Sequence, residues 1–199
     1  MPGLKTTVRI AVTLLLPALL AGCGSLLESN GPPNTQWWLE PVALEPIQLP
    51  EDAPLTVHVA VVPGLDTDRI LNLDDGARLN SYAGAHWPDH LPEVLGSVVT
   101  RSLAAAHGAP VRAGERAEED GCLLDLEARS FFGRIDATGI TQRVEVSLAG
   151  TLACPAFERP VQANQSVGVG ENRLGPIVAA FQEALDRTMV EVAGQLTTE

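Results

Sequence analysis

The chain has little positive charge, and this scarcity excludes a large class of partners. Its 13 lysine and arginine residues face 25 acidic residues, which gives a formal net charge of −12. Lys5 is the only lysine. Proteins that bind nucleic acid neutralise phosphates with clustered Lys and Arg, so we expect no nucleic-acid partner. The same acidity argues against adhesion to anionic lipid head groups by charge.

Long apolar runs are also missing beyond Cys23, so we expect no membrane-spanning segment there. At the N-terminus, Lys5 and Arg9 flank the start of an apolar stretch, Ile10 to Leu20. Its length of about 11 residues is too short to cross a bilayer but is typical of an export signal.

The segment Leu19-Leu20-Ala21-Gly22-Cys23 ends that stretch and is typical of a lipobox. We therefore predict that residues 1–22 are a lipoprotein signal peptide and that the thiol of Cys23 is acylated, with no other cofactor. An ordinary cleavage site beside an incidental cysteine is the alternative. Without Lys5 and Arg9 the mature part carries 11 basic and 25 acidic residues, a charge of −14. By resemblance to known lipoprotein sorting, Gly24 favours the outer membrane over the inner one.

Cysteine is scarce as well, with three in the chain. If Cys23 carries lipid, Cys122 and Cys154 remain as an even pair. They lie near the outer ends of two predicted strands joined by a hairpin, and an oxidising periplasm permits a disulfide between them. Two buried thiols are the alternative.

Residues 23–54 are predicted to be a lipidated cysteine followed by a proline-rich tether. Six prolines fall in this segment, and proline-rich linkers are semi-extended at about 3 Å per residue. Trp37 and Trp38 form an apolar island inside it. We interpret the island as a short edge strand near residues 36–40, with contact to a membrane or a partner as the alternative.

Residues 55–199 are predicted to form a single α+β periplasmic domain. Its elements follow the order β(β)αβββα, a sandwich with a mostly antiparallel sheet and two helices packed on one face. Residues 64–86, rich in Asp, Asn and Gly, are expected to be irregular. The predicted strands are 55–62, 122–132, 144–152 and 161–169, and the predicted helices are 88–107 and 174–196.

Catalytic motifs are scarce, so we expect no enzyme and no metal site. His86 and His90 lie four residues apart, but Pro88 separates them at the start of the predicted helix, which favours a surface pair. His58 is expected to be a packed or edge residue. Gly168-Val169-Gly170 resembles half of a dinucleotide fingerprint, but Arg173 occupies the position of the third glycine.

An ordered set of weak motifs resembles the ABC-type transport auxiliary lipoproteins, which include the paraquat-inducible protein C type. After the lipobox come Trp37-Trp38-Leu39-Glu40-Pro41, then Leu65-Asp66-Thr67-Asp68-Arg69-Ile70. Tyr82 to Trp87 and then Leu91-Pro92 follow, just before a helix. The chain departs from the family in an acidic insert at residues 71–78 and in its extra cysteine pair.

The resemblance implies a non-catalytic docking subunit of an intermembrane lipid transport system. Such systems pair an ABC transporter with MCE-domain proteins, which would be the partners of a lipoprotein anchored in the outer membrane and facing the periplasm. Self-association is a further expectation. Alternatives are a lipid- or ligand-binding carrier and a structural lipoprotein of envelope assembly. The candidate interface residues are Trp37, Trp38, Asp66, Arg69, Tyr82 and Trp87; for Tyr82 and Trp87 the alternative is packing of the helix onto the sheet.

Overall fold

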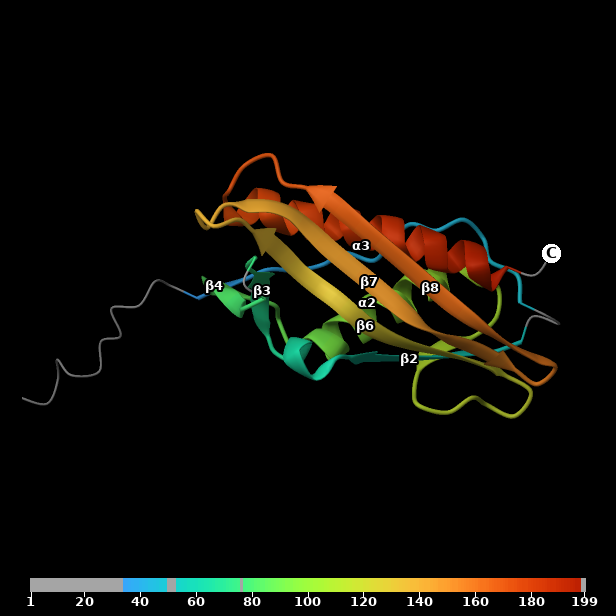
Figure 1. Cartoon of the computed structure of the whole chain (residues 1–199). Coiled ribbons are helices and arrows are strands. Elements are labelled where there is room, and N and C mark those ends of the chain that lie inside the picture. Colours follow the sequence, from blue (N-terminus) through green and yellow to red (C-terminus); the bar gives the residue numbers. More distant parts are fainter. Residues whose placement is uncertain (1–33, 50–52, 76, 198–199) are drawn as a thin grey trace, which may run out of the picture. The chain divides into compact units, whose positions relative to one another are not determined.

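The computed structural model describes residues 34–49, 53–75 and 77–197, which form one mixed α+β domain (Figure 1). The predicted signal peptide and Cys23 lie outside the described residues. An eight-stranded sheet carries two helices, which confirms the predicted α+β class with two helices, although the sequence predicted fewer strands. The strands are β1 (Thr35–Gln36), β2 (Leu55–Val61), β3 (Arg69–Leu73), β4 (Leu79–His86), β5 (Val111–Ala113), β6 (Cys122–Ile135), β7 (Thr141–Cys154) and β8 (Phe157–Gly168). A short 3-10 turn, η2 (Pro63–Leu65), and the helices α2 (Leu91–Ala106) and α3 (Leu174–Leu196) complete the fold.

The sheet is mostly antiparallel and is organised around β6. On one side, β6, β7 and β8 form an antiparallel meander. On the other side the sheet has two branches. One branch is β2, which runs parallel to the first half of β6 from Leu55↔Cys122 to Val61↔Ala128, followed by β5. The second branch is β3, β4 and β1, which begins beside Gly133 of β6. Parallel neighbours need a crossover connection, and α2 lies in the connection between β2 and β5.

Both helices cover the same face of the sheet, as predicted (Figure 1). Along β6, Leu124 and Leu126 are buried beneath the helices, whereas Asp125 is exposed on the opposite face. Strand side chains alternate between faces, so this pattern places the core on one side only. Within the described part of the chain, neither helix is long and apolar enough to span a bilayer.

The segment expected to be irregular, residues 64–86, instead contains η2, β3 and β4. Its polar composition concealed the strands because two of the polar residues, Asn72 and Asp74, are buried. A bulge also shifts the β3–β4 register between Arg69 and Leu71. Gly84 lies in that bulge with φ of 66°, which a residue with a side chain rarely adopts.

Part of the predicted tether, residues 34–49, belongs to the domain. Leu39, Val42, Ile47 and Leu49 are all buried, so the proline-rich segment 34–49 packs against the domain and is not a free tether. The predicted edge strand exists as β1, slightly earlier than expected, and pairs with the end of β4.

A disulfide joins Cys122 to Cys154, as the sequence analysis favoured. The two residues lie at the start of β6 and the end of β7, with their Cα atoms 4.2 Å apart. The bond therefore closes the open end of the β6–β7 hairpin.

Candidate functional site

Trp87 is a core residue and not an interface residue. It is 2% exposed and packs edge-on against Phe131 and Phe181, with ring centroids 5.8 and 5.5 Å away. These rings come from β6 and α3, so Trp87 fills the space between the sheet and the helices. The interface prediction for Trp87 is therefore wrong, and the alternative of packing is correct.

Tyr82 is half-buried and positions β4 against the neighbouring strands. Its hydroxyl lies 2.9 Å from Oγ1 of Thr141 in a hydrogen bond. Its Oη occupies the space above Gly133, where an added Cβ would lie only 2.2 Å away. Burial raises the pKa of the Tyr82 phenol above its ordinary value. These contacts give Tyr82 a structural role within the sheet.

Asp66 belongs to a loop that two histidine–aspartate pairs fasten to the end of β4 and to the start of α2. Nδ1 of His90 lies 2.8 Å from the Asp66 carboxylate, and Nδ1 of His86 lies 2.9 Å from that of Asp68. The bond to Asp66 raises the pKa of His90, and the bond to His86 lowers the pKa of Asp68. The neighbouring Arg69 is exposed on the surface.

His86 and His90 are also candidates for a metal-binding or catalytic pair. In the described ranges, no group of three or more His, Cys, Asp or Glu side chains could hold a metal ion. A hydrolase of the Ser-His-Asp type needs a nucleophile hydrogen-bonded to the second ring nitrogen of the histidine. Among the described residues, no Ser, Thr or Cys makes that contact with His86 or His90. These pairs are best explained as links that hold the loop to the end of β4 and to the start of α2.

Trp38 is the aromatic candidate that the fold leaves exposed. Its neighbours fix its backbone: the amide of Trp37 donates to the carbonyl oxygen of His86 at 2.8 Å, and Leu39 is 1% exposed. The Trp38 side chain is nevertheless 59% exposed. Trp37 is half-buried, which leaves Trp38 as the accessible member of the pair.

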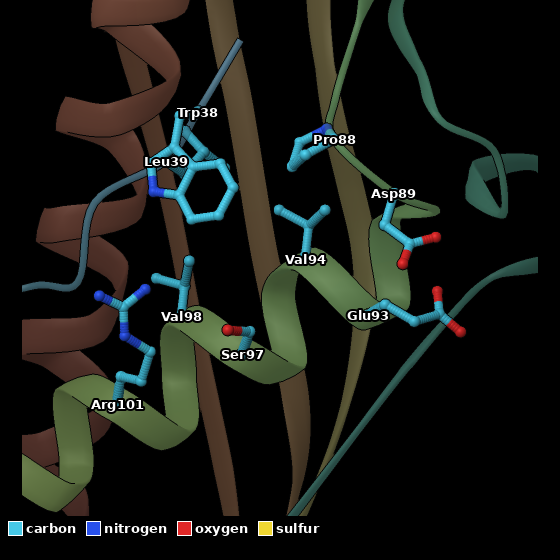
Figure 2. Close-up of a pocket in the computed structure, with 9 residues that line it drawn as sticks. All are labelled: Trp38, Leu39, Pro88, Asp89, Glu93, Val94, Ser97, Val98 and Arg101. Atoms are coloured by element: carbon cyan, nitrogen blue, oxygen red, sulfur yellow. The ribbon is translucent and has the colours of Figure 1, made fainter. Parts of the chain in front are cut away.

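The Trp38 ring forms one wall of a cleft against α2 (Figure 2). We call this the Trp38 cleft; its volume is about 270 Å³. Figure 2 shows Val94 and Val98 facing the ring, Arg101 at one end, and Asp89 with Glu93 at the other. The remaining lining residues are Leu39, Pro88 and Ser97. The cleft is therefore an apolar slot with opposite charges at its two ends.

An exposed tryptophan on a fixed backbone suits a protein-binding surface. Interface hot spots are enriched in Trp and Arg, and a preformed anchor loses little entropy on binding. The sequence analysis found Trp38 but missed Arg101 and the valines of α2. Val94 and Val98 have the helical spacing of core residues, and both are in fact largely buried, so periodicity alone did not distinguish the floor of a cleft from the interior.

Comparison with known proteins supports the fold only. No family model matches the chain, and no curated protein matches it. A crystal structure described as an uncharacterized protein has a TM-score of 0.63 and 15% identity, covering 79% of this chain and all of the other. A DUF330 protein from Xanthomonas campestris has a TM-score of 0.62 and 18% identity, covering 81% of this chain and 97% of its own. At these identities the likeness shows the fold alone.

Proposed function

We propose that the chain is a lipid-anchored, non-catalytic docking subunit of an MCE/ABC-type intermembrane lipid transport system. It is anchored in the outer membrane through acylated Cys23 and faces the periplasm. Its partners are an MCE-domain protein and, through it, the components of the ABC transporter. The observation that carries the docking role is the exposed Trp38 ring on a fixed segment beside α2. The type of transport system is inferred from the resemblance of the ordered sequence motifs to the ABC-type transport auxiliary lipoproteins.

The position of the domain boundary refines this proposal. Since the residues from Asn34 onward belong to the domain, ten residues, 24–33, separate it from Cys23. A fully extended chain of that length spans at most about 40 Å. The docking surface therefore lies close to the membrane that holds Cys23, and a partner must reach across the periplasm to meet it.

The filled interior supports docking over the carrier alternative. A carrier needs an apolar cavity of several hundred Å³. In this fold the rings of Trp87, Phe131 and Phe181 meet between the sheet and α3. The Trp38 cleft, of about 270 Å³, and a larger groove between β2 and α2, of about 780 Å³, both open at the surface and do not enclose a ligand in the core.

The test is co-isolation of the tagged full-length chain from detergent-solubilised envelopes, with quantification of its partners. We expect an MCE-domain protein together with a permease and an ATPase. Trp38→Ala should reduce their recovery about thirtyfold, since truncating a hot-spot tryptophan costs at least about 2 kcal/mol. Ile140→Ala, which truncates another exposed apolar residue (45%), is the matched control and should change nothing. Recovery of outer-membrane barrel proteins alone would overturn the proposal.

The anchor has its own test. Cys23→Ser should release the domain from the membrane fraction and abolish incorporation of labelled palmitate. Persistent labelling of the Cys23→Ser chain would contradict the lipid assignment.

A further inference from the structure

The sheet has an open edge at β2. The neighbouring strand β5 pairs with Leu55, Thr56 and Val57 and then ends. The last contact between these segments is the amide of Gly114, which donates to the carbonyl oxygen of Val57 at 2.9 Å. The rest of β2, His58 to Val61, has β6 on one side and no strand on the other.

The backbone alternation identifies the groups that face the open side. The Leu55 amide donates to Pro110 on the β5 side, whereas the Val62 amide donates to Ala128 of β6. Because N–H and C=O groups alternate between the two edges of a strand, those of Val59 and Val61 point away from β6. No hydrogen bond joins these four groups to any described residue.

This open edge borders a groove, which we call the β2 groove. Its volume is about 780 Å³, and it lies between β2 and α2. Gly96 of α2 leaves space in its wall, since a Cβ placed there would meet no atom within 4 Å. The hydroxyl of Thr100, which also lines the groove, has no hydrogen-bond partner among the residues that the structure describes. The groove thus combines unpaired backbone groups with room for added side chains.

The edges of the same sheet at β8 and β4 are protected, unlike the open part of β2. On β8, Pro160 carries no N–H group, and the amide side chain of Gln195 accepts from the Gln162 amide at 3.0 Å and donates to its carbonyl at 2.8 Å. On β4, β1 covers the carboxyl end, and the bulge at Gly84 interrupts the rest. Proline, capping side chains and bulges are the usual means of preventing strand addition, and β2 has none of them between His58 and Val61.

The charges around the β2 groove indicate the occupant. Three carboxylates line it, from Asp66, Glu93 and Glu115, against the single arginine Arg101. Glu93 and Arg101 also line the Trp38 cleft, so one partner can contact both sites across α2. We propose that the β2 groove binds an extended, arginine- or lysine-bearing segment of the partner protein, which pairs with Val59 and Val61 as an added strand. This inference deepens the proposed function and rests on it for the partner's identity.

Amide hydrogen exchange in the full-length chain tests the pairing directly. The probe is the synthetic peptide Val-Arg-Val-Arg-Val, and the control is Val-Glu-Val-Glu-Val. In the free protein the amides of Val59 and Val61 should exchange faster than that of Ala60 between them. The basic peptide at ten times its Kd should slow both about tenfold, while Ala60 stays unchanged. No protection, or equal protection by the acidic peptide, would overturn the inference.

Two variants separate a lost site from a lost fold. Val61→Pro removes one outward N–H group and no hydrogen bond to β6, so it should abolish the protection of the Val59 amide in a folded domain. Gly96→Leu fills the groove and should have the same effect, whereas Ala104→Leu, at an exposed α2 position outside the groove, should not. Wild-type protection in both Val61→Pro and Gly96→Leu would contradict the inference. Peptide binding without co-isolation of an MCE-domain protein would instead contradict the proposed function, while the assignment of the β2 groove as a peptide-binding site would stand.

Discussion

Removing the disulfide should destabilise the domain by a calculable amount. Cys122 and Cys154 are separated by 32 positions in the sequence. Closing a loop of that length in the unfolded chain removes entropy equivalent to about 3.7 kcal/mol at 25 °C. The folded hairpin changes little, because the ladder from Leu123↔Ala153 onward holds β6 and β7 in place without the bond.

The assay is urea unfolding of the chain, followed by far-UV circular dichroism, which reports the loss of the sheet and helices in every variant. With an m-value of about 2 kcal/mol/M, loss of the bond should lower the midpoint by about 2 M. The sample should be unfolded and refolded under reducing conditions, since Cys122 is fully buried. The double variant Cys122→Ala, Cys154→Ala should match the reduced protein and be insensitive to reductant. An unchanged midpoint after verified reduction would refute the reasoning.

Three further predictions follow from single contacts. Trp87→Ala should lower the free energy of unfolding by about 3–5 kcal/mol, measured in the same urea assay, because it empties a packed core site; a cost below 1 kcal/mol would contradict its core role. An NMR titration should give His90 a pKa above its ordinary value, and Asp66→Asn should lower that pKa. The pair therefore stabilises the fold at low pH, and this contribution is lost as the pH rises through the raised pKa. An unshifted His90 pKa in the wild type would disprove the contact. Gly150→Ala should cost about 3 kcal/mol or more, because its Cβ would lie 1.9 Å from a carbonyl oxygen of β6. Gly168→Ala, with no atom within 4 Å of its Cβ, is the control for thermal unfolding, and equal Tm values for the two would show that the sheet relaxes.

The sequence revealed the elements whose periodicity is regular. The stripe of α3 and the alternation of β6 and β7 predicted the helix and the hairpin, because each segment buries one face over many residues. β3 escaped detection because it is short and buries the polar residue Asn72, and β4 because Ala85 is its one fully buried residue. The docking of residues 34–49 was missed since Leu39, Val42 and Ile47 follow no regular period among the prolines.

The candidate site was predicted only in part, because tertiary packing decides which side chains stay exposed. Trp38 and Trp87 are the same residue type in similarly short motifs, yet one is 59% exposed and the other 2%. Trp87 is the buried one because it packs against Phe131 and Phe181, which lie far along the chain. The open edge of β2 depends likewise on where β5 ends, which no local pattern predicts.

The central claim, that this domain docks an MCE-domain protein, is tested most directly by photo-crosslinking in living cells. The photoreactive residue p-benzoylphenylalanine replaces Trp38, and the crosslinked partner is identified by mass spectrometry. We predict crosslinks to an MCE-domain protein, and none from the same residue placed at Val190, which is equally exposed (57%) on α3. Crosslinks from position 38 to an outer-membrane barrel protein alone would contradict the account.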